Sequence, residues 1–244
     1  LEWNAKRRIL KELSKLPADF VLLDLGAGSS YNVVDFFVAA PSGLLVLCPE
    51  VTSVLNAYSF LKTAAFRILH RSFPEGSEER AEVLAYVGTK TEGSGLSFLD
   101  FARGLAERRP ERGGPALEAL SRLLPRVVLN RGKSPEDAEL GYRLRDISRK
   151  NLGLSLEFSG FLLEDPGVAK SVAARRPLLD LDASSPFARG VQALATRLAQ
   201  APEASPPLAT EGPDGEAEAE LAVAAAGQNE GEDELARLAA EAFA

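Results

Sequence analysis

The apolar positions of this chain fall into two alternating patterns. Short segments rich in apolar residues predict buried strands, and they cover residues 20–25, 44–48, 126–130 and 156–162. Apolar residues at helical spacing predict helices between them, near residues 4–16, 31–40, 54–70, 135–151, 166–175 and 185–200. Strands that alternate with helices through short connections are typical of an α/β fold with a doubly wound, mostly parallel sheet.

Three regions depart from this alternation and define the predicted domain organisation. Residues 1–200 form the α/β domain, within which residues 72–115 are rich in charge, Gly and Pro and predict a helical insertion. Residues 201–231 are rich in Ala, Pro, Glu and Gly and predict a disordered acidic linker. Residues 232–244 are weakly amphipathic and predict a short helix.

Charge is distributed unevenly. The net charge is −7, yet residues 201–244 hold 11 acids and one base, whereas residues 1–200 hold 24 acids and 27 bases. The acidity therefore belongs to the tail. The single cysteine, Cys48, excludes an intrachain disulfide and favours a reducing, cytoplasmic compartment. No apolar run approaches the length of a membrane span.

The run at residues 20–25 carries the most informative chemistry. Asp24 stands near its carboxyl end, and Gly26 and Gly28 follow. A carboxylate at that end of a parallel strand is suited to holding Mg²⁺ through water, and the glycines let backbone N–H groups approach a phosphate. The segment predicts the metal and γ-phosphate side of a nucleotide site; the alternative is a buried strand that ends in an Asp-capped turn.

Further motifs follow the other predicted strands in order. Pro49-Glu50-Val51-Thr52-Ser53 comes after the second, Asn130-Arg131 after the third, and Leu163-Glu164-Asp165-Pro166-Gly167 after the fourth. Together with Asp24-Leu25-Gly26-Ala27-Gly28, this chain resembles the MinD/ParA group of P-loop ATPases over residues 1 to about 200. It most resembles the FlhG-like branch that regulates flagellar number. The resemblance implies a P-loop NTPase fold.

On the phosphate side, the resemblance implies roles for four residues. Asp24 matches the aspartate that orients Mg²⁺ through water. Gly26 and Gly28 match the switch segment that senses the γ-phosphate of ATP. Glu50 lies on a loop that is near the nucleotide and the dimer face in this family.

On the base side, the resemblance implies that Asn130 hydrogen-bonds the adenine, because an amide offers both a donor and an acceptor. Arg131 would pack beside the base. Leu163 and Glu164 match the loop that closes over the base, although the family usually has a proline at the position of Leu163.

The central departure from the family is the missing phosphate cradle. No glycine-rich loop ending in Gly-Lys-Thr occurs, and the nearest similar stretch, Val87-Gly88-Thr89-Lys90-Thr91, lacks the preceding glycines. We therefore expect the carboxyl-terminal part of such an ATPase, without catalytic residues of its own and not competent alone. The alternative is a non-catalytic interaction module with a degenerate nucleotide site. A missing central strand also predicts poor stability, unless another chain or a rearranged sheet fills the gap.

For the parent protein, the resemblance implies a cytoplasmic bacterial ATPase that uses ATP and Mg²⁺, forms an ATP-dependent homodimer and binds a regulatory protein. Its role would be spatial: flagellar number, division-site placement or cargo positioning. DNA binding is less favoured, because the arginines that could form a basic face alternate with acids; they include Arg103, Arg108, Arg109, Arg112, Arg143, Arg145 and Arg149. Membrane binding by the acidic tail is also not favoured. The only histidine, His70, is predicted on a helix surface.

Overall fold

The computed structural model describes residues 3–201 except 14, 41 and 91–95, and also Arg237. The strands of the described part are β1 (Leu44–Leu47), β2 (Arg126–Gly132) and β3 (Glu157–Leu163). Its longer helices are α1 (Trp3–Leu13), α2 (Tyr31–Ala39), α3 (Val51–Arg71), α4 (Glu78–Lys90), α5 (Phe98–Arg108), α6 (Pro110–Ser121), α7 (Ala138–Leu152), α8 (Pro166–Ala174) and α10 (Pro186–Gln200). Two short helical turns, η1 (Pro135–Asp137) and α9 (Leu178–Leu181), complete the described elements. The linker and the final helix predicted for residues 201–231 and 232–244 lie almost wholly outside this part.

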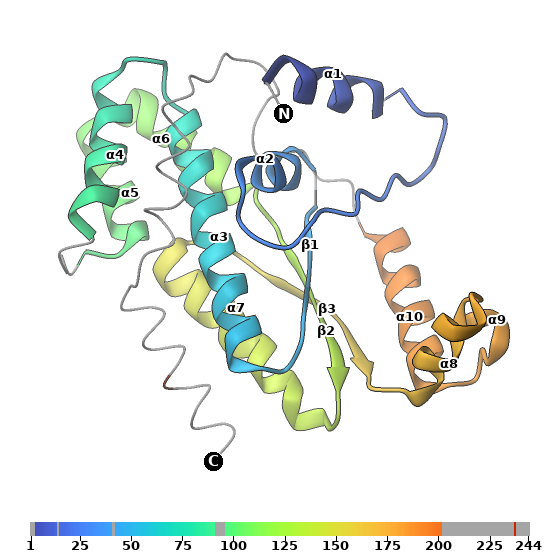
Figure 1. Cartoon of the computed structure of the whole chain (residues 1–244). Coiled ribbons are helices and arrows are strands. Elements are labelled where there is room, and N and C mark those ends of the chain that lie inside the picture. Colours follow the sequence, from blue (N-terminus) through green and yellow to red (C-terminus); the bar gives the residue numbers. More distant parts are fainter. Residues whose placement is uncertain (1–2, 14, 41, 91–95, 202–236, 238–244) are drawn as a thin grey trace.

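The described strands form one open parallel sheet in the order β1-β2-β3 (Figure 1). Leu45 lies beside Val127 and Leu47 beside Leu129 in the first pair of strands. In the second pair Val127 lies beside Phe158, and the register then shifts by one residue. Parallel pairing requires a long crossover, which the intervening helices supply. The predicted α/β class with a parallel sheet is confirmed.

Helices cover both faces of this sheet. A Cβ added to Gly141 of α7 would lie 3.1 Å from Leu129 Cδ1, so α7 packs closely on one face. A Cβ added to Gly160 of β3 would lie 3.4 Å from Leu194 Cδ1 of α10 and 3.6 Å from Val128 Cγ1. Because neighbouring residues of a strand point to opposite faces, Leu129 and Val128 place α7 and α10 on opposite sides.

Helix α3 runs through the centre of the core. It contacts β1, α2, α4, α6 and α7, and Leu61, Ile68 and Leu69 are fully buried. The prediction that His70 lies on the helix surface is wrong: the residue is 5% exposed, and its ring stacks on Phe66 with centroids 6.5 Å apart. A helix packed on several sides has little solvated face to offer a polar residue at this position.

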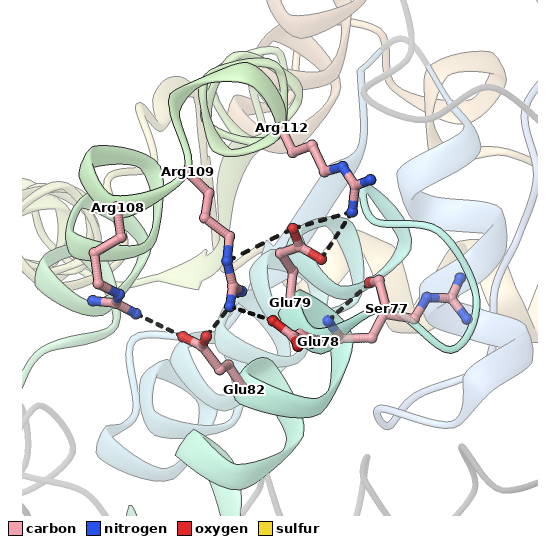
Figure 2. Close-up of polar contacts among 8 residues, drawn as sticks. Ser77, Glu78, Glu79, Glu82, Arg108, Arg109 and Arg112 are labelled. Carbon is pink, nitrogen blue, oxygen red and sulfur yellow. Dashed lines mark hydrogen bonds and ion pairs between the residues drawn. The ribbon is translucent and has the colours of Figure 1, made fainter.

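The described residues of the region predicted as an insertion, 72–115, hold α4, α5 and the first half of α6, which continues to Ser121. Glutamates of α4 and arginines at the junction of α5 and α6 join them in a Glu–Arg clasp, formed by Glu78, Glu79, Glu82, Arg108, Arg109 and Arg112. Figure 2 shows Arg109 within this group: its Nη2 lies 2.9 Å from Glu78 Oε2 and its Nη1 lies 2.8 Å from Glu82 Oε1. These arginines pair with α4 rather than with the acids beside them in sequence.

Glu79 is the buried member of the clasp, with a side chain only 5% exposed. Arg112 Nη1 lies 3.2 Å from Glu79 Oε1. A hydrogen bond from its own backbone N–H, together with the charges of Arg112 and Arg109, outweighs burial and lowers the pKa of Glu79 below its ordinary value. The glutamate therefore stays ionised and paired at neutral pH.

We expect Arg109→Ala to lower the free energy of unfolding by roughly 1 kcal/mol, because several charge contacts between α4 and the α5–α6 junction are lost together. The change should shrink at high salt, since the clasp is partly solvated. Arg103→Ala is the control, because Arg103 is exposed on α5 and outside the clasp. Urea unfolding of the two variants at low and high salt measures these changes in stability. Equal losses from Arg109→Ala and Arg103→Ala would contradict a stabilising role for the Glu–Arg clasp.

The predicted strand at residues 20–25 is not formed in the structure. The segment is irregular, and its apolar side chains are exposed: Phe20 by 64%, Val21 by 42%, Leu22 by 87% and Leu23 by 41%. An apolar run becomes a strand only when a neighbouring edge accepts its hydrogen bonds, and no strand among the described residues does so here. The second predicted strand is correct in position but only partly buried, because Val46 is 58% exposed.

Candidate nucleotide-binding edge

The predicted base-side residues follow the carboxyl ends of the strands. Asn130 and Arg131 lie in the last three residues of β2, Leu163 ends β3, and Glu164 follows it. Glu50 is the N-cap residue of α3, three residues beyond β1. Parallel strands end at one edge of their sheet, where open α/β folds bind ligands. Figure 1 shows the arrowheads of β2 and β3 directed to the same lower edge.

The end of β2 has an unusual backbone. Arg131 has a φ of 60°, in the left-handed region that few residues with side chains adopt. Asn130 Oδ1 accepts a hydrogen bond from Arg131 N at 2.9 Å, which supports this conformation. The pairing of β2 with β3 is irregular between Leu129 and Gly132. Strained backbone of this kind at a strand end is a reason to look for function there.

A contact between two strand ends brings the base-side residues together. Arg131 Nη2 lies 3.4 Å from Glu164 Oε1, and both side chains remain about half exposed. Glu164 N also donates to Gly132 O at 2.8 Å, which fixes the start of the loop. The structure therefore places Asn130, Arg131, Leu163 and Glu164 in one neighbourhood that solvent can reach.

Two aspartates fix the loops beside this contact. Asp137 Oδ2 accepts hydrogen bonds from Lys133 N at 2.6 Å and from Ser134 N at 3.2 Å. Asp165 Oδ1 accepts one from Gly167 N at 2.7 Å at the start of α8. This bond from the backbone of Gly167 lowers the pKa of Asp165 below its ordinary value. Both loops are therefore held by capping aspartates.

Sequence reasoning did not assign roles to these capping aspartates, although the signals were present. Ser134-Pro135-Glu136-Asp137 has the spacing of a capping box, with proline in the first turn. Asp165-Pro166 has the N-cap aspartate and first-turn proline that begin α8. Such local signals locate the ends of helices, and here those helix ends border the candidate site.

The predicted phosphate-side residues lie elsewhere. In Figure 1 the trace between α1 and α2, which contains Asp24, Gly26 and Gly28, runs across the upper half of the picture, away from the lower edge. Asp24 is exposed, and Gly28 has a φ of 103°, a conformation that suits glycine. The structure does not bring this segment to the residues after β2 and β3. The proposed role of Asp24 toward Mg²⁺ stays a prediction.

Within the residues that the structure describes, no three His, Cys, Asp or Glu side chains gather into a metal-binding group. A Mg²⁺ ion held through water by one carboxylate and by phosphate oxygens would not need such a group. None of the described helices combines the length and apolar character that crossing a bilayer requires.

Neither a scan against protein-family models nor a search of curated proteins produced a match for this chain. Its function must therefore be argued from the geometry and chemistry of its own residues.

Proposed function

We propose that this chain provides the base side of an ATP site in a MinD/ParA-like spatial regulator. The observation that carries the proposal is the contact of Arg131 with Glu164 at the carboxyl edge of a parallel sheet, 3.4 Å between Nη2 and Oε1. It joins the two segments, Asn130-Arg131 and Leu163-Glu164, for which the resemblance implies contacts with adenine. Two segments that are distant in sequence thereby meet at one edge.

The chemistry of these residues suits a purine. The Asn130 side chain accepts a hydrogen bond from Arg131 N through Oδ1, and its NH₂ group is of the kind that can donate to a ring nitrogen. The planar guanidinium of Arg131 can stack on an aromatic base. Leu163 offers an apolar contact, and Glu164 keeps Arg131 in place.

The phosphate side would need groups that these 244 residues do not contain, since they include no Gly-Lys-Thr loop. Asp24 would orient Mg²⁺ through water only if a phosphate-binding loop came near it. The chain by itself is therefore proposed to bind the nucleoside part weakly and not to hydrolyse ATP. With the loop supplied, catalysis would consist of positioning and charge stabilisation.

In the parent assembly we infer an ATP-dependent homodimer that changes its regulatory protein partner on hydrolysis, with Glu50 near the dimer face. The biological role would be flagellar number, division-site placement or cargo positioning in the bacterial cytoplasm. DNA and membrane surfaces are not proposed as partners. Three arginines considered for a basic face, Arg108, Arg109 and Arg112, are engaged in the Glu–Arg clasp.

The test is a titration of the isotope-labelled chain with adenosine monophosphate, followed by backbone amide NMR signals. We expect shifts confined to the segments around Asn130 and Glu164, with a dissociation constant on the order of 1 mM or weaker, because only base and ribose are held. Guanosine monophosphate should give clearly smaller shifts. Signal shifts that map elsewhere, or no shifts at about 10 mM ligand, would overturn the proposal. Micromolar binding of Mg²⁺-ATP would show that the chain also holds the phosphates, and would overturn the claim that it provides only the base side of the site.

Asn130→Ala tests the adenine contact directly. Loss of a hydrogen bond to the base should weaken adenosine monophosphate binding about tenfold, equivalent to about 1.4 kcal/mol. Gln192→Ala removes an exposed amide on α10 and serves as the control that should leave binding unchanged. If both variants bind adenosine monophosphate as tightly as the unmodified chain does, Asn130 does not hydrogen-bond the adenine.

The second candidate is a non-catalytic interaction module, and the missing phosphate loop favours it. The same titration separates the two functions. An interaction module with a degenerate site should show no preference for adenosine over guanosine and no effect of Asn130→Ala.

A further inference from the structure

We propose that the acidic segment at residues 228–244 docks on the exposed side chains of α8 and α9. We call this place the α8–α9 surface, and it consists of Val172, Arg175, Arg176 and Leu181. A contact of this kind would shield the surface from other proteins until the segment is released. It goes beyond the proposed function and does not depend on it, because it involves neither nucleotide nor the residues after β2.

The first observation is the apolar exposure of these two helices. Val172 of α8 is 72% exposed, and Leu181 of α9 is 41% exposed. Beyond the run at residues 20–25, no large apolar side chain in the described part is more exposed than Val172. In Figure 1 the two helices lie side by side at the lower right, outside the sheet, and they contact each other. Covering these side chains would remove apolar area from water, which is favourable.

The second observation is positive charge that no nearby acid compensates. Residues 166–200 hold five bases and two acids. Arg175 and Arg176 are exposed, and neither makes a salt bridge with another described residue. The arginines of α7, by contrast, pair with Glu139 and Asp146 of their own helix. The α8–α9 surface therefore attracts an acidic segment more strongly than α7 does.

The third observation is the strained end of α8. Arg175 is the C-cap residue and has a φ of 51°, in the left-handed region where glycine is usual. Its N–H donates to Val172 O at 3.1 Å, and Arg176 N donates to Ser171 O at 3.1 Å, so the turn is held in place. The turn presents two adjacent arginines at a cost in backbone energy. Strained backbone of this kind is typical of functional positions.

The segment at residues 228–244 has the complementary composition. It carries one base and five acids, which are Glu230, Glu232, Asp233, Glu234 and Glu241. Apolar residues recur among the acids at helical spacing, at Leu235, Leu238, Ala242 and Phe243. Arg237, the described residue of this stretch, is helical. An acidic amphipathic helix can bury its apolar side chains against an apolar surface while its carboxylates bind guanidinium groups.

The connection between the two is long enough. α10 begins four residues after α9 ends, and its 15 residues extend about 22 Å. Residues 201–227 follow it, and a flexible chain of that length has an end-to-end distance of about 30 Å. The segment can therefore return past α10 to the α8–α9 surface. Tethering gives it an effective concentration in the millimolar range, which favours it over the same segment of a second copy at micromolar concentration.

The experiment uses the full isotope-labelled chain with Cys48→Ser and Ala240→Cys. A nitroxide on the new cysteine broadens the amide NMR signals of residues that lie close to the acidic segment. We expect residues 169–181 to lose at least about half of their signal intensity relative to the reduced label, because a tethered segment stays mostly bound at a millimolar effective concentration. Signals of α7 should keep their intensity. A loss spread evenly over the chain, or no loss at residues 169–181, would overturn the proposal.

Charge reversal tests the role of the arginines. Arg175→Glu combined with Arg176→Glu should restore most of the lost intensity, because the acidic segment is then repelled. The matched control, Arg8→Glu combined with Arg103→Glu, reverses the same charge at exposed arginines of α1 and α5 and should leave the broadening unchanged. Equal broadening in the two double variants would mean that the α8–α9 surface does not hold the segment.

A mixed sample separates docking within one chain from docking between two copies. It contains isotope-labelled chain without nitroxide and unlabelled chain with nitroxide. Broadening of residues 169–181 in this sample would assign the contact to a second copy and would overturn docking within one chain. None of these measurements involves nucleotide, so failure here is distinct from failure of the proposed function.

Discussion

Asp35→Asn is expected to lower the free energy of unfolding by about 3–5 kcal/mol, the cost of removing one partner from a buried ion pair. The side chain of Asp35 is 3% exposed. Lys6 Nζ lies 2.7 Å from its Oδ2, and Arg67 Nε lies 2.9 Å from its Oδ1. Arg71 Nη1 stands 3.6 Å away. Without the carboxylate, these cations lose the charge that compensates them.

The effect should be large because one carboxylate links α1, α2 and α3. Lys6 belongs to α1, Asp35 to α2 and Arg67 to α3. Few other contacts hold α1 to α2, so we expect α1 to become mobile in the variant. Asp19→Asn is the control, because Asp19 is exposed in the segment after α1. Urea unfolding with an unchanged m-value would measure the loss; a change no larger than that of the control would contradict this account.

The same carboxylate makes a pH dependence predictable. Burial alone would raise the pKa of Asp35, but the charge and hydrogen bonds of Arg67 and Lys6 outweigh it, so the pKa is lowered. A group with a lowered pKa in the folded state contributes its full stability above its unfolded value, near pH 3.9. That contribution disappears as the pH falls through the folded pKa. We expect acid unfolding below about pH 4 to be less steep in Asp35→Asn.

Most elements could be predicted because their signals are local. The strands at residues 126–130 and 156–162 and the helices predicted between residues 135 and 200 are marked by apolar period, proline and caps, and the structure forms all of them. The run at residues 20–25 looks the same as the run at 44–48 in sequence. What separates them is a neighbouring strand, and β1 has β2 whereas residues 20–25 have none. Pairing is a property of two segments, so one segment's pattern cannot decide it.

The residues of the candidate site also fall into two groups, those whose positions follow from local sequence signals and those whose positions depend on packing. Asn130, Arg131 and Glu164 could be expected to meet, because the ends of adjacent parallel strands share an edge whatever the details of packing. The position of Asp24 depends on whether its strand pairs, and so it could not be predicted. The ion pairs of Asp35 were also hidden, since they join residues 29 and 32 positions apart in sequence. Their formation depends on how α1, α2 and α3 pack together.

Gly113→Ala is expected to lower the free energy of unfolding by about 1–3 kcal/mol, the usual cost of forcing atoms into a packed interface. A Cβ at Gly113 would lie 2.4 Å from Ala106 Cα and 2.9 Å from Ala106 N, both backbone atoms of α5. Backbone cannot rotate away as a side chain can, so α6 would have to move off α5. Intrinsic helix propensity alone would predict the opposite, a gain of about 1 kcal/mol for alanine over glycine.

The control for this change is Gly104→Ala in α5, the partner helix. A Cβ there meets only the end of the flexible Arg108 side chain, at 3.4 Å. Propensity should therefore dominate, and the variant should be more stable by about 0.5–1 kcal/mol. The two Gly→Ala changes thus carry opposite signs, although they lie in neighbouring helices of the same insertion. Thermal and urea unfolding of both variants would measure the sign of each stability change. A gain in stability from Gly113→Ala would mean that α5 and α6 are not packed backbone to backbone.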